Sequence, residues 1–113
     1  MPARNILSSA PPYPVEQALK RLGANLRTAR LRRNLTIKEI ADKIGTGPRA
    51  VMDAEKGKPS TGIVVYTALL WAYGLLEPFS ELADPAADEE GLTLELKNGR
   101  VRARPRTELD NDF

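Results

Sequence analysis

The chain has 113 residues, with 17 Lys or Arg against 15 Asp or Glu and a formal net charge of +2, and its length suits one domain core with short tails. It contains no cysteine and no histidine, which excludes disulfides, zinc fingers, imidazole bases and thiol nucleophiles. Neighbouring carboxylates such as Glu89 and Glu90 fall in a predicted linker without fixed geometry, so we expect no enzyme, no metal site and no cofactor.

Residues 1–14 contain four prolines and are predicted to form a flexible N-terminal arm, because proline blocks helix formation and the segment has little to bury. The arm holds no long apolar run, so neither a secretory signal nor a membrane anchor is expected. The longest apolar stretch, residues 62–76, is too short for a membrane span, which needs about 20 residues. The sequence therefore predicts a cytoplasmic protein without membrane contact.

Residues 15–84 carry the periodicity of helices. The first helix is predicted to begin at about Val15, with one apolar stripe made of Val15, Leu19, Leu22, Leu26 and Ala29. Leu35 is expected to pack in the loop that follows. The second helix is predicted to begin at a capping box formed by Thr36 and Glu39, and to place Ile37, Ile40, Ala41 and Ile44 on one face.

The spacing of the next residues predicts a sharp turn into a third helix. Gly45 can end the second helix in a left-handed conformation, and Pro48 suits the first position of the third. Ala41 is small where the two helices cross, and Val51 offers the apolar contact that holds them together. This is the pattern of a DNA-binding helix-turn-helix.

A fourth helix is predicted through Ala72, with Val65, Ala68, Leu69 and Ala72 facing inward and Gly74 closing it. A short fifth helix is predicted at about residues 77–82, and Phe79 and Leu82 are expected to contribute to the core. The fold prediction for residues 15–84 is thus an all-α, five-helix helix-turn-helix domain.

Residues 85–113 are predicted to hold an acidic linker, a short β-hairpin or strand and a disordered tail. Alternating residues flank Asn98 and Gly99, the strongest short-range signal for a two-residue hairpin. The hairpin would place Leu92, Leu94 and Leu96 on the same face as Val101 and Ala103. An isolated hairpin is marginal in water, so it would need its own domain, a second subunit or another protein to pack against.

Charge is strongly segregated along the chain. Residues 15–60 hold eleven Lys or Arg against five acids, residues 76–95 hold seven acids and no bases, and residues 97–106 hold five bases and no acids. A basic body with an acidic spacer suits a polyanion on one face and another protein elsewhere. The alternative is ordinary solvated surface charge.

Three short runs resemble the Cro and phage-repressor (XRE) helix-turn-helix family over about residues 18–82. They are Leu22-Gly23-x-x-Leu26-Arg27-x-x-Arg30, then Leu35-Thr36-x-x-Glu39-Ile40-Ala41-x-x-x-Gly45, then Val51-x-x-x-Glu55-x-Gly57. The resemblance implies a five-helix DNA binder, usually a homodimer, whose second motif helix enters the major groove. It also implies that Arg30 and Glu55 form a structural salt bridge between the first helix and the end of the third.

The end of the domain is similar to the HipB-type antitoxins, in the runs Leu70–Leu75, Leu82–Pro85 and Glu89–Leu92. This similarity implies a HipA-type kinase toxin as a further partner, and C-terminal strands that help to join the subunits.

The resemblance places DNA contacts on the helix-turn-helix. The candidate residues are Thr36, Ile37, Lys38, Thr46, Gly47, Pro48, Arg49, Met52, Asp53, Lys56 and Lys58. Thr36 and the free amides at the start of its helix suit a phosphate, with charge added by Lys38, Lys56 and Lys58 unless these are simply solvated. Arg49, whose guanidinium can pair with guanine O6 and N7, is the foremost base reader; its alternatives are a phosphate or solvent.

The chain departs from the family pattern at two positions. The family often has glutamine at the first position of the second helix and polar residues at the start of the third, where this chain has Ile37 and Pro48. With few base-reading groups, specificity is expected to depend on DNA shape, on the arm that contains Arg4, or on dimer spacing.

A subunit interface is predicted on the fourth helix at Tyr66, Leu70, Trp71 and Tyr73, with core packing as the alternative. The predicted function is a sequence-specific transcriptional repressor that binds double-stranded DNA as a homodimer, as the autoregulating antitoxin of a HipA-type toxin. Two alternatives stay open: a stand-alone phage or host regulator, and a protein-interaction module that has lost DNA binding.

Overall fold

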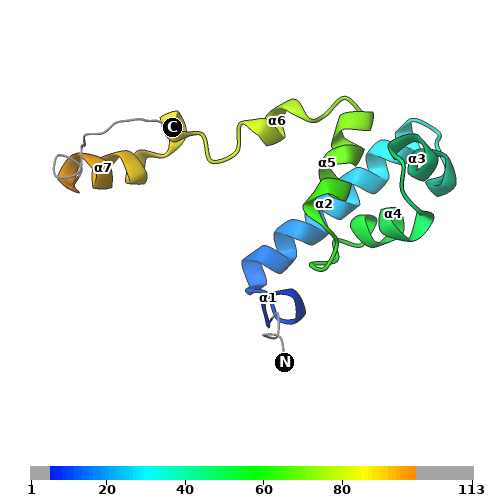
Figure 1. Cartoon of the computed structure of the whole chain (residues 1–113), viewed down its shortest axis with the longest axis horizontal. Coiled ribbons are helices and arrows are strands. Elements are labelled where there is room, and N and C mark those ends of the chain that lie inside the picture. The colour runs from blue at the N-terminus through cyan, green and yellow to red at the C-terminus, as the bar shows by residue number, and fades with distance from the viewer. Residues whose placement is uncertain (1–5, 99–113) are drawn as a thin grey trace. The chain divides into compact units, whose positions relative to one another are not determined.

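The computed structural model describes residues 6–98, and the regular secondary structure of this part is helical throughout (Figure 1). The elements in chain order are α1 (Ile6–Ser9), α2 (Tyr13–Arg32), α3 (Ile37–Ile44), α4 (Pro48–Glu55), α5 (Ile63–Ala72), α6 (Glu77–Ser80), the 3₁₀ turn η1 (Pro85–Ala87) and α7 (Glu89–Asn98). The predicted all-α class is confirmed for these residues. Across residues 6–98, no helix combines the length and the apolar character that crossing a bilayer requires.

The chain divides into two compact units between Ser80 and Glu81. In the first unit, α4 packs against α2, α3 and α5, and α3 also packs against α5 (Figure 1). These four helices share one core, made of Leu26, Ala29, Ile40, Ala41, Val51, Ala54, Tyr66, Leu69 and Tyr73. Burying each large apolar side chain of this kind contributes about 1.5–3 kcal/mol, which makes this core the main source of the unit's stability.

Both ends of α3 are fixed by the predicted local contacts. The Thr36 hydroxyl accepts a hydrogen bond from the Glu39 amide at 3.0 Å, and the Glu39 carboxylate accepts one from the Thr36 amide at 2.8 Å. Gly45 follows the helix with φ 85°, the left-handed conformation that glycine adopts at little cost. Pro48 then opens α4 at its first turn, as predicted.

Two glycines allow α2 to approach the end of α4 backbone to backbone. A Cβ on Gly23 would lie 2.6 Å from the carbonyl oxygen of Ala54, and one on Gly57 would lie 2.5 Å from that of Leu19. Gly57 also has φ +70°. These glycines belong to the motif recognised in the sequence, and the close approach is the physical reason for them.

The N-terminal arm is partly helical, contrary to the prediction for residues 1–14. α1 forms one turn, and α2 begins at Tyr13, ahead of the expected Val15. Pro14 lies in the first turn of α2, where a proline loses no helical hydrogen bond, so it starts the helix instead of blocking it. Arg4 lies outside the described residues.

The fifth predicted helix is shorter than expected, because α6 ends at Ser80. Phe79 is half-buried, whereas Leu82 is 68% exposed and belongs to the second unit. The expectation that Leu82 contributes to the core is therefore wrong.

The second unit contains a helix where the first hairpin strand was predicted. Leu92, Leu94 and Leu96 lie in α7, so the strand prediction is wrong for these residues, while Gly99 and the return strand lie outside the described residues. The Asp88 carboxylate accepts a hydrogen bond from the Gly91 amide at 3.0 Å, which caps the helix start. Two glutamates follow in the first turn, where they complement the helix dipole, and leucine is a good helix former.

Candidate nucleic-acid interface

The outer face of α4 presents a stripe of exposed side chains. Val51 and Ala54 are 0% exposed and face α2, α3 and α5, which fixes how α4 is rotated. Arg49, Met52 and Lys56 follow the spacing i, i+3, i+7 and lie exposed on the opposite side. Because the buried face is well packed, this stripe is held on a rigid element.

The start of α3 adds a second group of candidate residues. The capping box uses the amides of Thr36 and Glu39, so the amides of Ile37 and Lys38 are left at the positive end of the helix. The turn into α4 is accessible as well, with Gly47 and Pro48 exposed and Thr46 half-buried. An anion that meets this edge would find backbone donors and a favourable dipole.

A pocket of about 290 Å³ joins the two helices, lined by Arg27, Arg30, Ile37, Met52, Glu55 and Lys56. The pocket connects α4's outer stripe to the first residue of α3 and to α2. Arg27 was part of the recognised motif but was not predicted as a contact residue. Its position three residues before the buried Arg30, on the same side of α2, is the signal that could have identified it.

The predicted ion pair lies at the bottom of this pocket. Arg30 Nε is 2.7 Å from Glu55 Oε2 and Arg30 Nη2 is 3.0 Å from Glu55 Oε1, while Arg30 Nη1 donates to the Leu35 carbonyl oxygen at 2.9 Å. The hydrogen bond with Glu55 raises the pKa of Arg30, against the opposing effect of burial. Since its donors are engaged inside the domain, Arg30 serves the fold, as the family resemblance implies.

Other predicted contact residues already have partners. Lys58 Nζ lies 3.4 Å from Asp53 Oδ1, and Lys38 Nζ lies 3.3 Å from Asp42 Oδ2 on an exposed turn of α3. The predicted base-reading role of Asp53 therefore competes with its pairing to Lys58.

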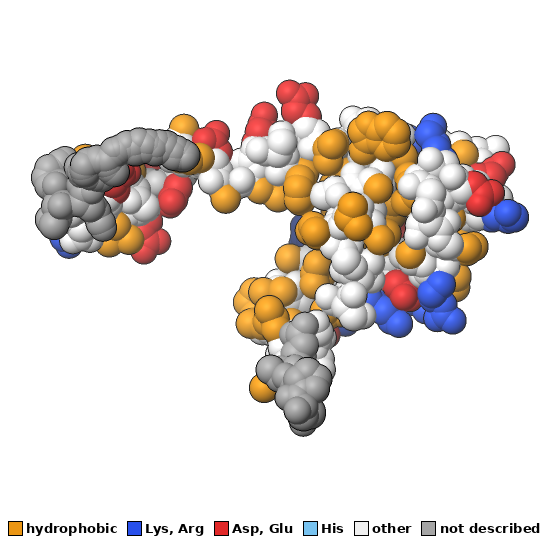
Figure 2. Space-filling model, viewed as in Figure 1, with side chains coloured by type: hydrophobic (Ala, Val, Ile, Leu, Met, Phe, Trp, Pro, Cys, Tyr) orange, Lys and Arg blue, Asp and Glu red, His pale blue; other side chains and the backbone are white. Residues whose placement is uncertain are grey.

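The remaining cations on this side are free to meet a ligand. Within residues 6–98, Arg27, Arg49 and Lys56 form no ion pair. Figure 2 shows Lys and Arg side chains gathered beside α4. The accessible positive charge of the helix-turn-helix is thus concentrated around the outer stripe of α4 and the pocket.

The predicted subunit interface on α5 is only partly on the surface. Tyr66 and Tyr73 are 2% and 5% exposed, so their assignment to an interface is wrong and the alternative of core packing holds for both. The Tyr66 hydroxyl donates to the Lys58 carbonyl oxygen at 3.0 Å, and burial raises the pKa of both phenols. The cause of the error is that α5 is apolar all round, so periodicity does not separate its inner face from its outer face.

The outer face of α5 remains apolar and accessible. Trp71 is 61% exposed, Ile63 63% and Val64 70%, and Leu70 is half-buried beside them. Figure 2 shows hydrophobic side chains over α5 and over the N-terminal part of α2. A patch of this kind on a small domain indicates an interaction surface.

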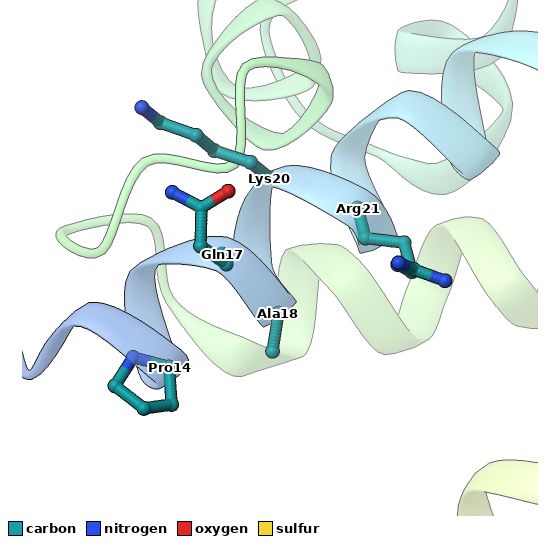
Figure 3. A pocket seen from close by; sticks show the side chains of 5 residues that line it. All are labelled: Pro14, Gln17, Ala18, Lys20 and Arg21. Atoms are coloured by element: carbon teal, nitrogen blue, oxygen red, sulfur yellow. The ribbon is translucent and has the colours of Figure 1, made fainter.

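A larger hollow of about 570 Å³ lies along the N-terminal part of α2, lined by Pro14, Gln17, Ala18, Lys20 and Arg21 (Figure 3). Figure 3 shows Gln17 and Lys20 extending away from Ala18 instead of converging on a common point. Lys20 Nζ is also 3.5 Å from a Glu16 carboxylate oxygen. This hollow therefore lacks the convergent polar groups of a binding site.

Comparison of the chain with protein-family models, with curated proteins and with solved structures finds no match in any of the three.

Proposed function

We propose that this protein is a sequence-specific DNA-binding transcriptional repressor of the XRE type, acting as a homodimer in the cytoplasm. The observation that carries the proposal is the exposed stripe of Arg49, Met52 and Lys56 on α4, rigidly held beside the amide-rich start of α3. An α-helix fits the major groove of B-DNA, and an accessible cationic edge beside it suits the phosphate backbone.

In the proposed complex α4 enters the major groove and Arg49 donates two hydrogen bonds to a guanine. The start of α3, at Thr36, meets a phosphate through backbone amides. Arg27 and Lys56, which have no ion pair in the described part of the chain, neutralise flanking phosphates. Phosphate contacts position the domain, and the side chains on α4 select the sequence.

A second copy of the chain is the proposed occupant of the outer face of α5. Leu70 and Trp71, which were predicted at the interface, lie on or near this apolar surface together with Ile63 and Val64. A twofold dimer that presents its α4 helices to successive major grooves would separate them by about 34 Å and would bind a palindromic operator.

Selection of duplexes from a random library with the full chain tests this proposal. We expect enrichment of a palindrome and an affinity that falls steeply with salt. Arg49→Ala should lose about 1–3 kcal/mol of discrimination at one base pair without loss of thermal stability. Arg32→Ala, which removes an exposed cation from the side of α2 that lies beside Leu75, is the matched control. Absence of binding to any duplex at low salt would exclude the repressor and would favour the protein-interaction module.

We also propose that the repressor is an antitoxin that binds a HipA-type kinase toxin and controls its own operon. The support is the similarity of the runs between Leu70 and Leu92 to HipB-type proteins. The full-length protein, isolated from its native host, should retain a kinase-like partner. Retention of no such partner would leave a stand-alone phage or host regulator.

A further inference from the structure

The pocket among α2, α3 and α4 is lined by two apolar side chains, Ile37 and Met52, together with four charged ones. Ile37, at the first position of α3, is half-buried and packs against the core. Met52, on the outer stripe of α4, is 38% exposed and lines the same pocket. Neither side chain carries an N–H or O–H donor, and the methionine sulfur is only a weak acceptor.

The floor of the pocket is polar but already satisfied. Arg30 and Glu55 bind each other through two short hydrogen bonds, and their side chains are 9% and 6% exposed. A ligand would therefore gain little by hydrogen bonding to them. The rim is different, because Arg27 and Lys56 line the same pocket and form no ion pair in residues 6–98.

Apolar side chains beside unpaired cations suit a ligand that presents an apolar group and is itself a polyanion. The edges of the bases in the major groove carry hydrogen-bond donors and acceptors and one apolar group, the C5-methyl of thymine. We propose that Ile37 and Met52 form a subsite for the C5-methyl group of a pyrimidine, thymine in unmodified DNA, while Arg27 and Lys56 meet the adjacent phosphates. The proposal rests on the proposed function, since it places α4 in the major groove.

The subsite gives Ile37 and Met52 a role in selecting the DNA sequence. A hydrocarbon wall discriminates by burying or failing to bury a methyl group, so each thymine that it reads should contribute about 3- to 5-fold in affinity. The effect is smaller than that of a paired arginine and guanine. A repressor of this kind would combine one strong guanine contact at Arg49 with weaker readout of neighbouring thymines.

The test uses the full chain and the tightest duplex selected from a random library. Each thymine of one half-site is replaced in turn by 2′-deoxyuridine, which keeps the pairing edge, the hydrogen-bonding groups and the charge but lacks the methyl. We expect one or two replacements to weaken binding about 3- to 5-fold. Met52→Ala should abolish this difference between thymine and uracil, and Met52→Leu should keep it.

Arg32→Ala controls for unspecific effects and should retain the full difference. Specific binding that is insensitive to uracil at every position would overturn the subsite and leave the repressor intact. A difference that persists undiminished in Met52→Ala would also overturn it. Failure to bind any duplex at low salt would overturn the proposed function and the subsite together. If Met52→Ala leaves DNA affinity and its uracil sensitivity unchanged but abolishes capture of a protein, the pocket takes an apolar side chain of that protein instead.

Discussion

The helix pair α3 and α4 and the C-terminal helix α7 are built from helices of similar length but are stabilised in different ways. α3 and α4 have eight residues each, and Ile40, Ala41, Val51 and Ala54 are 0% exposed. α7 has ten residues and none of them is buried. Its Leu92, Leu94 and Leu96 are 53%, 49% and 64% exposed.

The two regions are stabilised by different interactions. Isolated helices shorter than about 12–15 residues are marginal in water, so α3 and α4 owe their stability to the apolar faces that they bury together. α7 depends on its cap and on local helix propensity. We therefore expect α7 to open locally far more often than the helix pair, and expect binding surfaces on α4 to stay fixed while the second unit adapts.

The largest effect is expected at the buried ion pair. Glu55→Ala leaves Arg30 charged and unpaired at 7% exposure, and should lower the free energy of unfolding by about 3–5 kcal/mol. Asp42→Ala is the matched control, because it breaks the exposed pair with Lys38 on the same helix pair and should cost about 0–1 kcal/mol. Urea unfolding of both variants measures the difference.

Equal losses in these two variants would contradict the assignment of Arg30 and Glu55 to the fold. So would a Glu55→Ala protein that keeps its melting temperature but loses DNA binding.

The next prediction compares one apolar side chain from each region. Ile40→Ala should destabilise the protein by about 2–5 kcal/mol, because it leaves a cavity at a site with 0% exposure. Leu96→Ala, at 64% exposure on α7, should change the free energy of unfolding by less than about 0.5 kcal/mol. A large loss in Leu96→Ala would mean that α7 is buried against another surface in solution. It would contradict the conclusion that α7 depends on its cap and on local helix propensity.

The same contrast explains what the sequence could predict. The ends of α3 and α4 follow from residues whose roles are local: the capping hydroxyl of Thr36, the left-handed Gly45 and the first-turn Pro48. The ion pair of Arg30 and Glu55 followed from the family resemblance. These features were confirmed because a cap or a glycine turn acts within a few residues and leaves few alternatives.

The errors occur where a pattern fits two structures equally well. Alternating Leu92, Leu94 and Leu96 satisfy a strand, yet leucine and the surrounding glutamates also favour a helix. Along α5, the apolar sequence does not reveal that Tyr66 faces inward while Trp71 faces outward. The pocket beside Met52 was not predicted either, because it depends on how three helices meet.

Small effects are expected at the two buried tyrosines, Tyr66 within α5 and Tyr73 at its C-terminal end. Tyr66→Phe removes the hydrogen bond to the Lys58 carbonyl oxygen and should cost about 0.5–1.5 kcal/mol at neutral pH. The Tyr73 hydroxyl is buried without a hydrogen-bond partner among the described residues, so Tyr73→Phe should be nearly neutral. Thermal unfolding of the two variants at pH 7 separates these outcomes.

Raising the pH then tests the buried state of Tyr73. Burial raises its pKa in the folded protein, so the fold favours the neutral phenol. This contribution is complete below the unfolded pKa of about 10 and is lost as the pH rises through the folded pKa. Tyr73→Phe removes the titration, so its stability should fall less steeply than that of the wild type above pH about 10. Parallel alkaline profiles would mean that the Tyr73 phenol is solvated in the folded protein, and the inner face of α5 would then be as open as α7.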